Sequence, residues 1–146
     1  MSMTLTIAAL IAAASVQAAP GEAAWTWTLY ADSAPVVLAN EVPDTPNLRS
    51  TLECDPGSSV ARLTLYQAEG LTGMTRLAAG SSIAMTESET GRAGSVKLAL
   101  RTDHPVFAAF VSGGSLSMTA GETRRTLEIP AAHLAKLRRF AELCSG

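Results

Sequence analysis

Apolar and polar residues alternate over several short stretches of this 146-residue chain. In residues 25–30, Trp25, Trp27 and Leu29 occupy one side of the alternation, and two threonines and a tyrosine occupy the other. A period of two with aromatic and β-branched residues predicts a β-strand that buries one face. Other short runs of this kind predict strands at residues 36–39, 50–54, 60–67, 82–86, 95–101, 106–111, 115–119 and 123–129.

Residues that favour turns separate these runs. They include Asp55-Pro56-Gly57, the segment 87–94, Asp103-His104-Pro105 and Gly113-Gly114. About 8–9 short strands at such spacing are typical of antiparallel sandwiches and barrels. We therefore expect a mainly β fold, an antiparallel sandwich or barrel-like sheet, with one C-terminal amphipathic helix.

The periodicity changes after Pro130, a residue suited to the first position of a helix. One stripe of the predicted helix is apolar and consists of Leu134, Leu137, Phe140, Ala141 and Cys144. The other side carries Lys136, Arg138, Arg139 and Glu142. This arrangement predicts an amphipathic helix over residues 130–144 that packs on the sheet.

The first 18 residues contain no charged side chain. Their apolar run, Leu5 to Val16, is shorter than the ~20 residues that a membrane-spanning helix needs, but it suits the core of a secretory signal peptide. Small residues favour cleavage after Ala18, with Ala19 as the second choice. We expect a signal peptide at 1–18, a short flexible mature N-terminus at 19–24 and a single domain at 25–146. The mature protein is then periplasmic or secreted, without a transmembrane segment.

Two cysteines, Cys54 and Cys144, remain in the predicted mature chain. A secreted protein with two cysteines is expected to form one disulfide, which here would tie the C-terminal helix to a strand. The alternative is a cysteine nucleophile activated by His104 or His133. Neither histidine is close to a cysteine in sequence, and no recognisable nucleophile motif is present.

The composition argues against several classes of function. With 11 basic and 13 acidic residues, the chain lacks the positive charge typical of nucleic-acid-binding domains. The two cysteines and two histidines are far apart in the sequence and lack the Cys-x-x-Cys or His-x-x-x-His spacing of zinc sites. No calcium loop or phosphate-binding glycine loop is present. We therefore expect no cofactor and no metal.

No recognisable catalytic set is present either, so we expect a non-enzymatic, envelope-associated binding or interaction module. Its partner would be an unknown envelope protein or component. One alternative is a small periplasmic hydrolase with a site assembled in space, for which Asp103-His104 is the only local anchor. Another is a carbohydrate- or ligand-binding module in which Trp25 and Trp27 form a stacking platform.

Basic residues gather near the C-terminus. The candidates for contact with an anionic surface are Arg124, Arg125, Lys136 and Arg139. A basic outer face could bind anionic lipid or lipopolysaccharide. A solvated helix face explains the same residues.

The C-terminal half contains a series of short motifs. It runs from residues 106–110 and Ser112-Gly113 through residues 127–130 to residues 137–140 and Cys144. With the turn at residues 54–58, this resembles small secreted β-rich proteins of unknown function from Gram-negative bacteria. The resemblance covers about half of the predicted mature chain, and it implies no activity, cofactor or catalytic residue.

Overall fold

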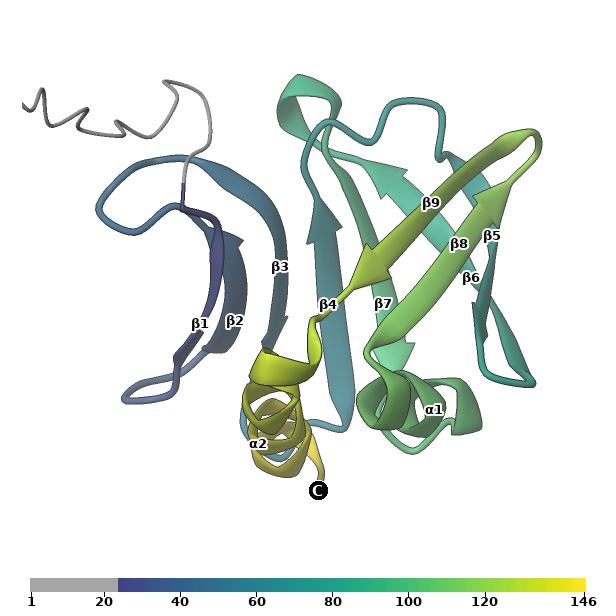
Figure 1. The fold of residues 1–146 in the computed structure, drawn as a ribbon. Coiled ribbons are helices and arrows are strands. Elements are labelled where there is room, and N and C mark those ends of the chain that lie inside the picture. The colour runs from purple at the N-terminus through teal and green to yellow at the C-terminus, as the bar shows by residue number, and fades with distance from the viewer. Residues whose placement is uncertain (1–23) are drawn as a thin grey trace, which may run out of the picture.

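A computed structural model describes residues 24–146. The predicted signal peptide, its cleavage after Ala18 or Ala19 and nearly all of residues 19–24 lie outside the described residues. Nine strands form one strongly curled, half-barrel sheet, and two helices lie together at one end of it (Figure 1). The strands are β1 (Thr26–Tyr30), β2 (Val36–Glu41), β3 (Leu48–Cys54), β4 (Val60–Leu65), β5 (Gly73–Ala79), β6 (Ser82–Thr90), β7 (Val96–Arg101), β8 (Ser115–Ala120) and β9 (Thr123–Glu128). The helices are α1 (Pro105–Gly113) and α2 (Leu134–Cys144), with single 3-10 turns at Arg92–Gly94 and Ala131–His133.

The strands follow the order β1-β2-β3-β4-β7-β6-β5-β8-β9 across the sheet, and every pairing is antiparallel. The pairing of β6 with β7 covers only two residue pairs, Glu89 with Lys97 and Thr90 with Val96. The sheet therefore divides into a five-stranded part and a part made of β6, β5, β8 and β9. This architecture confirms the expected mainly β fold with a C-terminal helix.

The inner face of the sheet carries the hydrophobic core. On five successive strands one row of leucines lies side by side, consisting of Leu29, Leu38, Leu52, Leu63 and Leu98. The helices cover this face with fully buried aromatic side chains, Phe107 and Phe110 from α1 and Phe140 from α2. Burial of this apolar surface is the main stabilising term for such a fold.

The C-terminal helix forms where the sequence predicted it, after a 3-10 turn that follows Pro130. Leu137, Phe140 and Cys144 are completely buried, as expected for an apolar stripe. The side chain of Lys136 reaches β1, where its Nζ donates a hydrogen bond of 2.5 Å to the carbonyl oxygen of Trp27. The helix is thus anchored at the free edge of the sheet as well as on its inner face.

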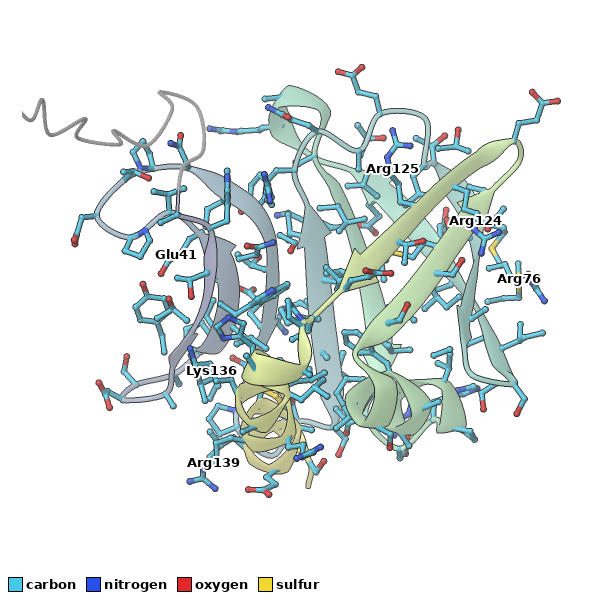
Figure 2. The ribbon with its side chains drawn as sticks, in the orientation of Figure 1. Glu41, Arg76, Arg124, Arg125, Lys136 and Arg139 are labelled. Atoms are coloured by element: carbon cyan, nitrogen blue, oxygen red, sulfur yellow. A yellow bond between two sulfur atoms is a disulfide. The ribbon has the colours of Figure 1, made fainter. Side chains whose placement is uncertain are left out.

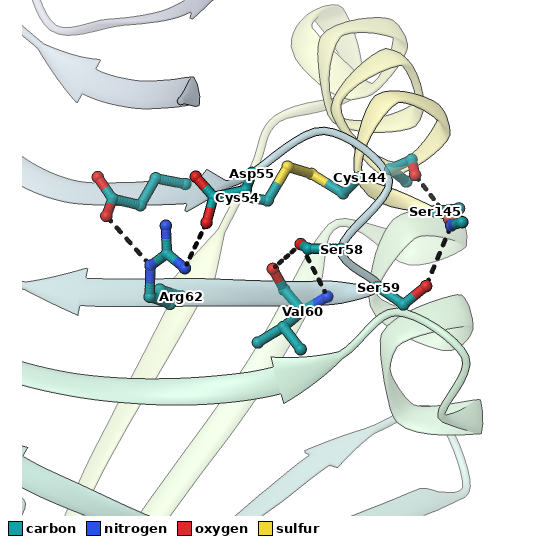
Figure 3. The surroundings of a disulfide bond; sticks show 11 residues. Cys54, Asp55, Ser58, Ser59, Val60, Arg62, Cys144 and Ser145 are labelled. Atoms are coloured by element: carbon teal, nitrogen blue, oxygen red, sulfur yellow. Dashed lines mark hydrogen bonds and ion pairs between the residues drawn. A yellow bond between two sulfur atoms is a disulfide. The ribbon is translucent and has the colours of Figure 1, made fainter. Parts of the chain in front are cut away.

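The predicted disulfide between Cys54 and Cys144 is confirmed (Figure 3). It joins the end of β3 to the end of α2, with 5.8 Å between the two Cα atoms. The backbone N–H groups of Gly57 and Ser59 donate to the carbonyl oxygens of Leu143 and Cys144, at 3.0 and 2.8 Å. The β3–β4 turn therefore satisfies carbonyl groups that the end of a helix leaves without partners.

The strand predicted at residues 106–111 is wrong, because this segment lies within α1. A short apolar run fits a buried strand and a buried helix equally well. The residues that flank this run favour the helix. His104 caps the helix, Pro105 occupies its first turn, and Gly114 ends it in the left-handed conformation with a φ of 78°.

Strand β5 was not predicted, and the turn expected at residues 87–94 begins too early, since β6 continues to Thr90. Along β5 the buried residues are Thr75, Leu77 and Ala79, and two of these are small or polar. The difference in hydrophobicity between the buried and the exposed positions of β5 is therefore small. Nine short runs were predicted as strands and nine strands are present in residues 24–146, because β5 takes the place of the segment that forms α1.

Replacing Gly114 with alanine is expected to destabilise the protein. A Cβ at this position would lie 2.5 Å from the carbonyl oxygen of Ile129 and 2.8 Å from Cδ2 of Leu134. The left-handed backbone adds strain for any L side chain. We expect the free energy of unfolding to fall by more than about 1 kcal/mol, measured by urea denaturation.

Gly113→Ala is the matched control, because a Cβ there meets no atom within 4 Å and the backbone is not left-handed. Alanine in the last helical turn should leave stability unchanged or raise it by up to about 1 kcal/mol. Equal losses in the two variants would contradict this account of the α1–β8 junction.

Removing the disulfide should also lower stability. The two cysteines are 90 residues apart in the sequence, so the bond restricts a long loop in the unfolded chain. For the double variant Cys54→Ala/Cys144→Ala we expect a loss on the order of 2–5 kcal/mol in urea denaturation. A reductant should destabilise the wild type in the same way and leave the double variant unchanged. Equal stabilities of wild type and variant would refute this role.

Candidate functional site

The outer face of β6, β5, β8 and β9 carries an exposed group of apolar side chains. Along β5, the inward residues alternate with outward Met74 and Arg76, and on β6 the outward residues include Ile83 and Met85. Met74, Ile83 and Met85 are 61%, 49% and 57% exposed, and we call them the apolar cluster. Arg76 lies directly opposite Met85 in the strand pairing. A charged side chain thus stands beside the apolar cluster.

On the same face, two arginines flank a threonine across three strands. Arg76 of β5 pairs with Thr119 of β8, and Thr119 pairs with Arg124 of β9. We call these three residues the arginine row, and Figure 2 shows Arg76 and Arg124 near each other on one side of the molecule. Both arginines and Thr119 line a cavity of about 300 Å³, together with Ser117 and Ser115 of β8.

Within the described part of the chain, the two guanidinium groups of this row have no acidic partner. Among residues 24–146, the ion pairs involve Arg62, Arg101 and Arg139, but neither Arg76 nor Arg124. Their side chains make no hydrogen bond within this part of the chain either. Two strand spacings of about 4.8 Å separate their Cα atoms, so two like charges lie close together. Solvent screens most of the repulsion between two exposed charges at this spacing, and an anion bound between them would be attracted by both.

The structure does not bring the four predicted basic residues together. Arg125 lies opposite Met118, and its guanidinium reaches the carbonyl oxygen of Glu69 at 3.5 Å. Lys136 binds Trp27, and Arg139 pairs with Glu142 at 3.1 Å. Figure 2 shows Lys136 and Arg139 beside α2, far from Arg124. Of the four, Arg124 alone belongs to the arginine row.

The two tryptophans do not form a joint stacking platform. Trp27 is only 3% exposed and belongs to the core. Trp25 is partly exposed, and the guanidinium carbon of Arg49 lies over its ring at 3.9 Å from the ring centre. One ring is therefore inaccessible, and the other already forms a cation–π contact.

The pairing of Asp103 with His104 that a hydrolase would need is not formed. Both carboxylate oxygens of Asp103 accept hydrogen bonds from Arg101, at 2.9 and 2.7 Å, and these bonds lower the pKa of the carboxyl. Nδ1 of His104 accepts a hydrogen bond from the backbone N–H of Val106. His133 lies in the 3-10 turn before α2, and both cysteines are in the disulfide.

A second cavity, of about 400 Å³, lies on the outer face of β3, β4, β7 and β6. Its lining combines both charges, and Arg62 there pairs with Glu53 at 3.2 Å. No cluster of three potential metal ligands occurs within residues 24–146. In the same region, no helix is both long and apolar enough to cross a membrane.

No protein-family model, curated protein or solved structure matches this chain. The candidate site therefore depends on geometry alone. Sequence reasoning identified Arg124 but missed Arg76, because β5 was not predicted. A weak signal was present in the alternation of Thr75 and Leu77 with Met74 and Arg76.

A pair of His104 variants tests whether this residue is a helix cap. Removing the acceptor with His104→Ala should lower the free energy of unfolding by about 1 kcal/mol. His104→Asn keeps a side-chain acceptor suited to this position, and its loss should be clearly smaller. Chemical denaturation followed by circular dichroism measures both. A loss as large for asparagine as for alanine would contradict the capping role.

Proposed function

We propose that this protein is a non-enzymatic, envelope-associated binding module that acts through the outer face of β6, β5, β8 and β9. The observation that carries the proposal is the apolar cluster of Met74, Ile83 and Met85 beside Arg76, which has no acidic partner among residues 24–146. Methionine and arginine are enriched at protein interfaces, and grouped exposed apolar side chains mark interaction surfaces. The location in the envelope follows from the leader predicted at residues 1–18.

Rigid strands display this face, which favours binding. Directly behind it, Leu77, Leu116 and Met118 are completely buried. Side chains on a well-packed sheet keep a fixed spacing, so the binding groups are arranged before a partner arrives. Such preorganisation lowers the entropic cost of association.

Binding is also favoured over hydrolysis. Asp103 and His104, the pair that the local sequence suggested for a hydrolase, have other partners. Asp103 binds Arg101, and His104 caps α1. Trp27, one of the two residues of the proposed carbohydrate platform, is buried in the core. The outer face keeps its apolar and cationic groups accessible.

Co-sedimentation with envelopes isolated from a Gram-negative bacterium tests this function. Wild-type protein should sediment with the envelopes, and the double variant Met74→Ser/Met85→Ser should lose most of the bound fraction. This follows because burial of two methionines contributes much of the apolar contact.

The matched control is Tyr30→Ser/Tyr66→Ser, which removes the two other large apolar side chains that are exposed within residues 24–146. This variant should bind as the wild type does. A wild-type protein that stays in the supernatant, or equal losses in both double variants, would refute the proposed function.

A further inference from the structure

The arginine row has the chemistry of an oxyanion site. Arg76 and Arg124 approach the same cavity from β5 and β9, with Thr119 between them. Guanidinium groups form strong, bidentate hydrogen bonds with phosphate and carboxylate oxygens. An anion held above Thr119 would be attracted by both positive charges.

Hydroxyl groups complete the set of donors. Ser115, Ser117 and Thr119 line the cavity, and none of their hydroxyls hydrogen-bonds to another group within residues 24–146. The phosphodiester of a phospholipid carries one negative charge on two non-bridging oxygens, and each oxygen can accept hydrogen bonds from a guanidinium and from a hydroxyl group. Two forked cations with neighbouring hydroxyl donors therefore provide partners for both oxygens of a phosphoryl group.

The surroundings indicate what kind of molecule carries this group. Arg76 lies beside Met85, so the cationic site borders the apolar cluster. Glu87 lies opposite Met74, and Glu128 lies opposite Ser115, which places acidic residues at two borders of the face. A positive centre with apolar side chains next to it complements an anionic amphiphile, such as a membrane lipid at the headgroup level.

We propose that Arg76, Thr119 and Arg124 bind the phosphoryl group of an anionic phospholipid, while Met74, Ile83 and Met85 enter the headgroup region. This inference rests on the proposed function and names the chemistry of its partner. The contact is non-covalent, with the guanidinium and hydroxyl groups as donors and the phosphoryl oxygens as acceptors.

Vesicle binding provides the test. Wild-type protein should bind vesicles that contain phosphatidylglycerol, and bind vesicles of pure phosphatidylcholine much more weakly. The variant Arg76→Gln/Arg124→Gln should lose roughly 30-fold in affinity for the anionic vesicles, the effect expected for two arginines at an anionic surface. Both substitutions replace exposed side chains, and thermal denaturation checks that the fold is retained.

Arg92→Gln/Arg138→Gln is the matched control, because it removes the same charge from two other exposed arginines. It should bind anionic vesicles within about twofold of the wild type, since surface charge outside the contact acts weakly. Equal affinity for both vesicle types, or equal losses in the two double variants, would overturn the inference.

A soluble probe distinguishes between a membrane lipid and a soluble phosphate compound as the source of the phosphoryl group. Titration with glycerol 3-phosphate should shift the NMR signals of Thr119 and Ser117 in the wild type, but not in Arg76→Gln/Arg124→Gln. Shifts without any vesicle binding would overturn the membrane lipid as the ligand. Envelope association that depends on Met74 and Met85 but not on the arginines would overturn this inference alone and leave the proposed function standing.

Discussion

Burial of one side of the curled sheet is the constraint on which the rest of this structure depends. The leucine row from Leu29 to Leu98 must face the interior of the curled sheet, and this fixes the pairing register of the strands that carry it. A slip by one residue would turn each strand's apolar side chains to the solvent. On β5 and β8, the burial of Leu77, Leu116 and Met118 likewise turns Arg76 and Thr119 outward, and the pairing with Thr119 places Arg124 on the same face.

The open sheet also needs elements that hold its ends. The Cys54–Cys144 bond and the backbone hydrogen bonds of the β3–β4 turn attach α2 to the sheet, while Lys136 binds the free edge of β1. At the opposite edge, β9 carries charged residues that discourage pairing with other chains. The outer face of β6, β5, β8 and β9 thus belongs to a sheet whose β1 side is held by α2 and whose β9 edge is protected by charge.

The sequence pattern predicted an element correctly where residues close together in the sequence show which side of the element is buried. The alternation in residues 25–30 predicted β1, and the apolar stripe ending at Cys144 predicted α2. Residues 106–111 were misassigned because an uninterrupted apolar run has no period that separates strand from helix. Strand β5 was missed because small residues bury well without a strong hydrophobic signal.

By itself, the sequence determined the mainly β architecture, the amphipathic C-terminal helix and the pairing of its two cysteines. These follow from periodicity and from the number of cysteines, which need no knowledge of distant contacts. Only the tertiary structure decided the candidate site, since Arg76 and Arg124 are brought together by β8, which lies between their strands. It also separated Arg124 from Lys136 and Arg139, because pairing between strands, and not distance along the chain, sets which charges share a surface.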